Sequence, residues 1–217
     1  MSTAQSPVTA IPGLSLFENL GRDEGLEQAL EMTRSAYPHE QVYGTYCTLH
    51  GYTDAPAPEV FAYLSDVRSL SEWTYSLRDF TRTDDPDLWR SHDRLGGEDT
   101  DIYTRVTANA EAMTVDYHCA WDQGEHLWMI YLMRVVPAPL VFDKPGSVVL
   151  WTNCKHPFYE KNPFPELAPP GRELWVGDVW PLFYAGHQME LDNLTTICEF
   201  RHTNGLPVAP DWDRVTE

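Results

Sequence analysis

The sequence is poor in basic residues. Fifteen Lys and Arg stand against 33 Asp and Glu, which gives a formal net charge of -18 over 217 residues. No run of Lys or Arg is present that could neutralise the phosphates of nucleic acid, and an acidic surface repels anionic lipids. We therefore expect neither nucleic acid nor a membrane as a partner, and we interpret the acidity as a solubility property.

Targeting segments and paired cysteines are also missing. No stretch of about 18 apolar residues occurs, and the N-terminal residues MSTAQSPVTAIPG have neither the basic nor the apolar part of a signal peptide. Cys47, Cys119, Cys154 and Cys198 lie far apart, without a CxxC pair or a zinc-type spacing. We expect a cytoplasmic protein with free thiols, three of them in buried strands or helices.

The sequence contains no motif of covalent or nucleotide chemistry. It has no GxSxG, no Ser/His/Asp order, no phosphate loop and no Rossmann glycines. His187 and Glu190 are three apart, and His118 and His156 occur elsewhere, but no strand supplies the tight His/Asp spacing of a metal site. The sequence therefore predicts no metal ion and no other cofactor.

The periodicity of apolar residues predicts an α+β protein. An N-terminal arm, residues 1–43, holds a helix over 23–37 that docks on the main domain or on a second subunit. Six strands follow one another, with turn signals between the first five. After a proline-rich insertion at 156–174, a helix is expected from Asp178, a plausible N-cap, to Arg201. The strands are expected at 75–84, 88–94, 101–109, 112–122, 127–136 and 147–155.

The stretch DAPAPEVFAYLSDVRSLSEWT, residues 54–74, links a first strand to this meander. Pro58 and Glu59 suit the first turn of a helix, and a second short turn should bury Leu70 and Trp73. With the order of elements, this stretch resembles the opening of START-like or Bet v 1-like (SRPBCC) proteins. The resemblance covers roughly residues 44–204 and leaves 205–217 as a C-terminal tail.

The resemblance implies a helix-grip fold. In that fold a curved antiparallel sheet, here of seven strands, wraps around the long C-terminal helix, with two short helices after the first strand. Among its subfamilies, the polyketide cyclase/aromatase and dehydratase group is the most similar in size and aromatic content. That group implies a cavity with an Arg on a central strand, a description that Arg105 fits.

The long helix supplies the main catalytic candidate. At about 100° per residue, His187 is centred on a stripe of Trp180, Phe183, Leu191, Leu194 and Cys198. A histidine in such a stripe is either a core residue bonded to a strand side chain or an acid/base group in a cavity; a metal ligand is the third reading. A pKa near neutrality would suit proton transfer.

The strands supply the other candidates. Tyr103 and Arg105 share one face of their strand, and Ile102, Thr104 and Val106 share the other, so the first pair either faces solvent or reaches the cavity. His118 is expected on the outer surface. The expected ligand-binding residues, for which core packing is the alternative, are Trp73, Tyr117, Trp121, Tyr131, Trp151, Phe183, Glu190 and Leu191.

The segment LWMIYLMRVV at 127–136 is apolar on both faces. The outer face of a helix-grip sheet is normally wet, so this strand suggests a cover, either the N-terminal arm or the second subunit of a homodimer.

Together these features predict an enzyme of specialised metabolism such as antibiotic biosynthesis. A cofactor-independent cyclase or dehydratase, of lyase or isomerase type, would act on an apolar or polycyclic small molecule, with His187, Arg105 and Tyr103 moving protons and holding enolate oxygens. The alternative is a non-catalytic carrier or sequestering (resistance) protein of the same fold. A third, weaker alternative is a protein-interaction module of the co-chaperone type.

Overall fold

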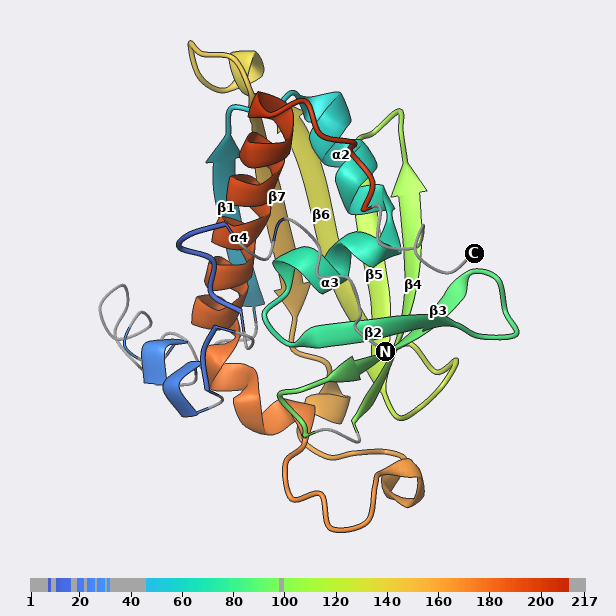
Figure 1. Ribbon diagram of the computed structural model, residues 1–217. Helices are drawn as coiled ribbons and strands as arrows, with labels where there is room; N and C mark the ends of the chain where they lie inside the picture. Colours follow the sequence, from blue (N-terminus) through green and yellow to red (C-terminus); the bar gives the residue numbers. More distant parts are fainter. Residues whose placement is uncertain are drawn as a thin grey trace, which may run out of the picture.

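The computed structural model describes residues 8, 11–16, 19–21, 23–25, 27–29, 31, 46–97 and 100–210. Its sheet has seven antiparallel strands in the order β1-β7-β6-β5-β4-β3-β2. Figure 1 shows this sheet curving around the long helix α4 (Phe183–Thr203), as the helix-grip expectation requires. The strands are β1 (Tyr46–Thr53), β2 (Leu77–Arg82), β3 (Leu88–Asp93), β4 (Asp101–Asn109), β5 (Thr114–Trp121), β6 (Met129–Pro137) and β7 (Ser147–Cys154).

The connection between β1 and β2 determines this strand order. It contains α2 (Ala57–Ser65), the 3-10 turn η3 (Val67–Ser69) and the short helix α3 (Leu70–Trp73). Pro58 and Glu59 lie in the first turn of α2, as predicted, and Asp66 ends that helix and accepts a hydrogen bond from the backbone N–H of Arg68. Because these elements carry the chain to the far edge of the sheet, β1 pairs with β7 instead of with β2.

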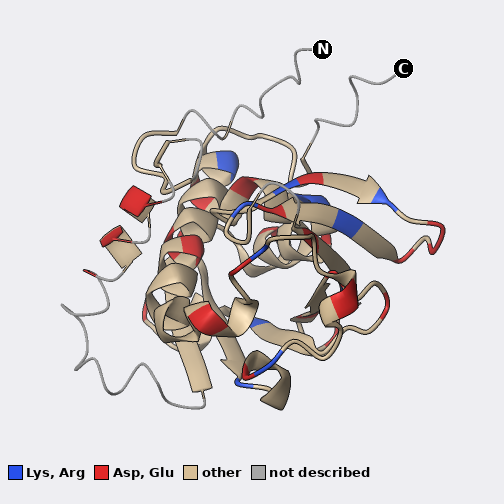
Figure 2. Ribbon diagram, turned by 90° about the horizontal axis from the view of Figure 1, so that it is seen from below, with Lys and Arg blue, Asp and Glu red and all other residues tan. Residues whose placement is uncertain are grey.

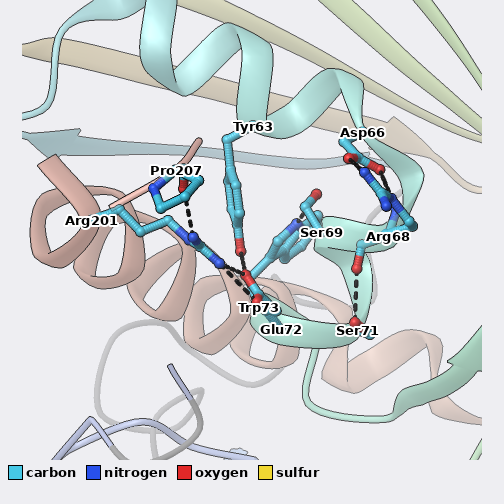
Figure 3. Close-up of polar contacts among 9 residues, drawn as sticks. All are labelled: Tyr63, Asp66, Arg68, Ser69, Ser71, Glu72, Trp73, Arg201 and Pro207. Atoms are coloured by element: carbon cyan, nitrogen blue, oxygen red, sulfur yellow. Dashed lines mark hydrogen bonds and ion pairs between the residues drawn. The ribbon is translucent and has the colours of Figure 1, made fainter. Parts of the chain in front are cut away.

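A buried ion pair joins α3 to α4. The Arg201 guanidinium lies 2.7 and 2.8 Å from the two carboxylate oxygens of Glu72, and the Tyr63 hydroxyl donates to the same carboxylate at 2.8 Å. A second Arg201 nitrogen donates to the carbonyl of Pro207 at 2.7 Å. Figure 3 shows these contacts beside Trp73, whose Nε1 donates to Ser69. The ion pair therefore fixes the position of Glu72. Its neighbour Trp73 lines the cavity described below.

Alternation along the strands separates two faces of the sheet. In β5, Val115, Tyr117 and Cys119 are buried against the core, whereas Asp116 and His118 on the outer face are half-buried. The outer position of His118 is therefore confirmed. All four cysteines are free, and Cys47, Cys119 and Cys198 are buried as expected, with Cys154 exposed.

The long helix begins differently from the prediction. Residues Val176–Leu182 form the 3-10 segment η7, and α-helical geometry starts only at Phe183, two residues after Pro181. A proline in a helix interior removes a backbone donor and its ring clashes with the preceding turn. Asp178 is therefore not the N-cap of α4; its carboxylate accepts a hydrogen bond from the N–H of Trp175, the residue before η7.

The described part of the N-terminal arm packs against α4. The Ser15 N–H donates to the Asn193 side chain at 3.0 Å, and Asn193 donates back to the Ser15 carbonyl at 2.9 Å. Ala29 forms a small buried cluster with Ala185 and Met189. Residues 23–25, 27–29 and 31 are helical; the rest of the expected helix lies outside the described residues.

The outer face of β6 carries exposed apolar side chains. Ile130 is 41% and Leu132 46% exposed, and Leu150 on the neighbouring β7 is 42% exposed. No described residue of the arm covers them, so the expected cover is not found in the part of the chain that the structure describes. A homodimer remains a prediction. Within the same described ranges, no helix has the length and apolar character needed to cross a bilayer.

Candidate active site

A cavity lies between the inner face of the sheet, α3, η7 and α4. The centre of a water molecule can occupy about 90 Å³ of it. Eight of the residues expected at the site line this cavity, and most of them are aromatic. They are Trp73, Tyr117, Trp121, Tyr131, Trp151, Phe183, His187 and Glu190.

Leu191, also expected to bind a ligand, does not line the cavity. It is fully buried and packs against β1 at Gly51, where an added Cβ would lie only 3.0 Å from Leu191 Cγ. The missing side chain at Gly51 lets the helix approach the sheet closely. Leu191 belongs to the core packing that seats α4 on the sheet.

Arg105 and Tyr103 require a correction. Both project from the outer face of β4, opposite the buried Ile102 and Thr104, and neither lines the cavity. Arg105 forms an exposed ion pair with Asp85 at 2.6 Å. Alternation in the strand decides this: Ile102 and Thr104 point inward, so their neighbours point outward. The structure does not bring this pair to His187.

The His187 ring is enclosed by aromatic side chains. It stacks on Trp151 with 4.5 Å between ring centroids, and it lies 4.9 Å from Phe183 and 5.4 Å from Tyr131. Its Nδ1 lies 3.8 Å from the sulfur of Cys47, and among the described residues Nε2 has no hydrogen-bond partner. The imidazole is therefore held by packing and by one weak polar contact.

Burial lowers the pKa of His187 to about 3, and burial raises the pKa of the Cys47 thiol to about 12. The expectation of a pKa near neutrality is corrected, because the dry aromatic surroundings disfavour the imidazolium ion. The ring is neutral at pH 7. In the tautomer with the proton on Nδ1, directed at the Cys47 sulfur, Nε2 carries a lone pair that can accept a proton or a hydrogen bond.

Glu190 is the group that titrates near neutrality. It projects from the same helix face as His187, one turn later, and accepts a hydrogen bond from the Tyr75 N–H at 3.2 Å. Burial and the nearby Asp93 carboxyl raise its pKa to about 8, although Arg78 and the Tyr75 bond act in the opposite direction. Most of this carboxyl group is therefore protonated at pH 7.

Asp93 is a cavity residue that the sequence did not indicate. It ends β3, accepts hydrogen bonds from Trp121 Nε1 and the Leu95 N–H at 2.9 Å each, and has its pKa raised, chiefly by burial. Asp93 enters the cavity because the end of β3 lies beside the buried Trp121, a contact between residues 28 apart in the sequence. Nothing in the local pattern SHDRLGG, however, distinguishes a buried carboxyl from a turn residue.

The pKa of Glu190 leads to a prediction for stability. Between the ordinary carboxyl pKa of 4.5 and about 8, the folded state binds more protons at this group than the unfolded state does. This contribution to the free energy of unfolding is therefore present at low pH and falls as pH rises, by at most about 1.4 kcal/mol per pH unit. We therefore expect the melting temperature of Glu190→Gln, relative to that of the wild type, to increase as the pH rises from about 5 to about 8, the range between the two pKa values.

Thermal unfolding of both proteins across this range measures the difference. It isolates Glu190 from His187, whose lowered pKa makes stability rise with pH between about 3 and 6.5. A difference that does not change with pH would contradict the assignment.

The proline-rich insertion packs over one end of the cavity wall. Arg172 forms a buried ion pair with Asp122 and lies over the Trp121 ring. Trp175 contacts both Trp121 and Trp128 edge-on or tilted. The chain that leaves the insertion supplies the cavity residues Val176, Val179 and Leu182. No residue of the insertion itself, 156–174, is among those that line the cavity.

Charged residues of both signs occur across the described elements. In Figure 2, Lys and Arg occupy scattered short segments, whereas Asp and Glu occur on many elements. Across the described residues, no three His, Cys, Asp or Glu side chains converge in a group that could hold a metal ion. His156, one of the histidines considered for a metal, instead caps η5 (Pro157–Tyr159) by accepting from the Phe158 N–H.

Structural comparison finds similar folds among solved structures. The Zhui aromatase/cyclase from Streptomyces sp. R1128 aligns with a TM-score of 0.50 and 13% identity, over 72% of this chain and 94% of that one. The di-domain aromatase/cyclase BexL of the BE-7585A pathway aligns with a TM-score of 0.50 and 15% identity, over 73% of this chain and 47% of its own. This chain has the START-like fold.

A START superfamily protein from Mycobacterium smegmatis also aligns, with a TM-score of 0.44 and 18% identity, over 74% of this chain and 99% of that one. No protein-family model and no curated protein matches the sequence. The two aromatase/cyclase alignments show the fold alone, and a fold does not specify the chemistry of its cavity.

Proposed function

We propose that this START-like protein is a cofactor-independent enzyme of the polyketide cyclase, aromatase or dehydratase type. Its substrate would be an apolar carbonyl compound held among the aromatic side chains of the cavity. The observation that supports this most directly is the pair on α4, in which a neutral imidazole and a largely protonated carboxyl group share one buried helix face. The aromatase/cyclase neighbours share the fold and agree with the proposal.

Such a pair suits the loss of water from a β-hydroxy ketone. His187 Nε2 takes a proton from the carbon next to the carbonyl, and the electrons of that C–H bond form an enolate. The enolate then expels hydroxide from the β carbon, forming the C=C bond. The imidazolium returns its proton to the leaving hydroxide, so the products are an enone and water. The adjacent enolate charge stabilises the imidazolium that the empty cavity disfavours.

A second candidate is a carrier or sequestering protein of the same fold. The closely packed aromatic walls around His187 favour it, because stacking holds a planar ligand without any proton transfer. The cytoplasmic location and a role in specialised metabolism are part of both proposals.

A product assay separates the two candidates. Purified protein is incubated with aromatic β-hydroxy ketones and linear poly-β-ketones, and each mixture is analysed by mass spectrometry, intact and after denaturation. We expect a dehydrated or cyclised product that forms faster than in buffer. Unchanged compound that stays bound to the intact protein would instead support the carrier.

A further inference from the structure

We propose that Glu190 acts as a neutral hydrogen-bond donor to the oxygen of the bound ligand, so that the cavity selects phenols, enols and enolates. This inference rests on the proposed function only for its catalytic meaning, because the recognition it describes can be measured without turnover. It gives Glu190 a role distinct from that of His187, and it specifies the chemical class of the ligand.

The carboxyl group of Glu190 is placed where it can contact a ligand in the cavity. The residue is 7% exposed, yet its side chain lines the cavity. One carboxyl oxygen accepts from the Tyr75 N–H, and for the other no hydrogen bond is found within the described ranges. Its place is one turn beyond His187 on the same helix face, so a ligand lying against the imidazole also reaches the carboxyl group.

The surroundings of Glu190 keep the group neutral. The Asp93 carboxyl lies near enough to oppose a second negative charge, and burial acts in the same direction. A neutral carboxyl group has an O–H that can donate, whereas a carboxylate only accepts. In a dry cavity such a donor stabilises negative charge on a ligand oxygen, as it does in ketosteroid isomerase.

The remaining ionisable groups near Glu190 come from several elements. Arg78 on β2 favours its ionised form, whereas Asp93 on β3 opposes it. Glu190 in turn raises the pKa of Cys47 on β1, of Tyr75 and of Tyr131 on β6, all of which stay neutral because burial raises each pKa further. His187 is neutral as well. Above its pKa, Glu190 itself therefore becomes the charge that repels an anionic ligand.

The size of the cavity suits a small ring system. A space with about 90 Å³ for water centres extends one water radius further on every side. Roughly one or two fused rings fit a space of this size. Nitrophenols are therefore suitable probes, and their phenolate form has its own absorption band.

Binding of 4-nitrophenolate and of its neutral methyl ether, 4-nitroanisole, tests the proposal. Titrations between pH 6 and pH 10 use the wild type, Glu190→Gln, Glu190→Met and Asp192→Asn. The last variant removes an exposed carboxylate from the same helix and is the matched control. We expect the wild-type affinity for phenolate to be constant to about pH 8 and then to fall about tenfold per pH unit.

Each variant has its own expected result. Glu190→Gln keeps an N–H donor and cannot ionise, so its affinity for phenolate should stay within a few-fold of the low-pH wild-type value and lose the alkaline fall. Glu190→Met removes the donor and should bind phenolate at least about tenfold more weakly. Asp192→Asn should behave as the wild type. 4-Nitroanisole should bind all four proteins alike, which shows that each cavity is intact.

Two results would overturn the proposal: unchanged phenolate affinity in Glu190→Met, or wild-type affinity that does not fall above pH 8. Failure of the proposed function looks different. Phenolate binding that depends on the Glu190 donor, without any product in the ketone assay, would support the recognition role of Glu190 and contradict the proposed enzyme. Turnover without phenolate recognition would support the enzyme and contradict the recognition role of Glu190.

Discussion

Turnover of a β-hydroxy ketone should fall by about 10²- to 10⁴-fold when His187 is replaced with alanine, because the substitution removes the only imidazole that lines the cavity among the described residues. Affinity for the unreacted ketone should change by no more than a few-fold, since Trp151, Phe183 and Tyr131 remain in place. Steady-state kinetics with a binding titration of a non-reactive analogue measures both quantities.

The pH profile adds a readout that a structural role would not produce. His187 remains neutral down to about pH 3, and Glu190 keeps its proton until about pH 8. The rate should therefore be level between pH 5 and pH 7 (inside these limits) and fall above about pH 8. In Glu190→Gln the alkaline fall should disappear.

His202 on the same helix is exposed and pairs with Glu59, so His202→Ala is the matched control and should keep full activity. Equal loss of turnover and of ligand affinity in His187→Ala would make the histidine a packing residue. The catalytic assignment would then be withdrawn.

Replacement of Arg201 with methionine, which removes the guanidinium group, should lower the free energy of unfolding by about 3 to 5 kcal/mol. In Arg201→Met the carboxylate of Glu72, which is 1% exposed, loses both of its contacts with the guanidinium group. An uncompensated buried charge is costly because water cannot reach it. Urea unfolding followed by tryptophan fluorescence measures the loss.

Two further variants identify the cause. Glu72→Leu combined with Arg201→Met removes both charges and should recover much of the stability, since an apolar pair of similar volume costs little. Lys155→Met breaks the exposed contact with Glu160 and should change stability by no more than about 1 kcal/mol. A double variant as unstable as Arg201→Met would show that packing, and not unpaired charge, accounts for the loss.

Several parts of this protein follow from local sequence. The proline and acid at the start of α2 and the alternation in β5 are short-range patterns, and each led to the observed element. The stripe on α4 likewise placed His187 among buried residues, because the helical period fixes which side chains share a face. Turn signals between the strands gave the meander, since hairpins are local structures.

Other features needed the three-dimensional arrangement. Arg105 was assigned to the cavity through resemblance, but the inward direction of Ile102 and Thr104 turns it to the outer face. The pKa values of His187 and Glu190 come from burial by segments far apart in the chain, among them β3, β7 and the 3-10 segment before α4. Asp93 enters the site because its strand ends beside Trp121, 28 residues away in sequence.

The sequence by itself thus determined the elements, their order and the helix face that carries the candidate acid/base pair, because all three depend on spacings within single segments. Only the tertiary structure decided the protonation of that pair, the exclusion of Arg105 and the inclusion of Asp93. Desolvation and Coulomb interactions depend on which side chains meet across the fold, and no local spacing encodes those distances.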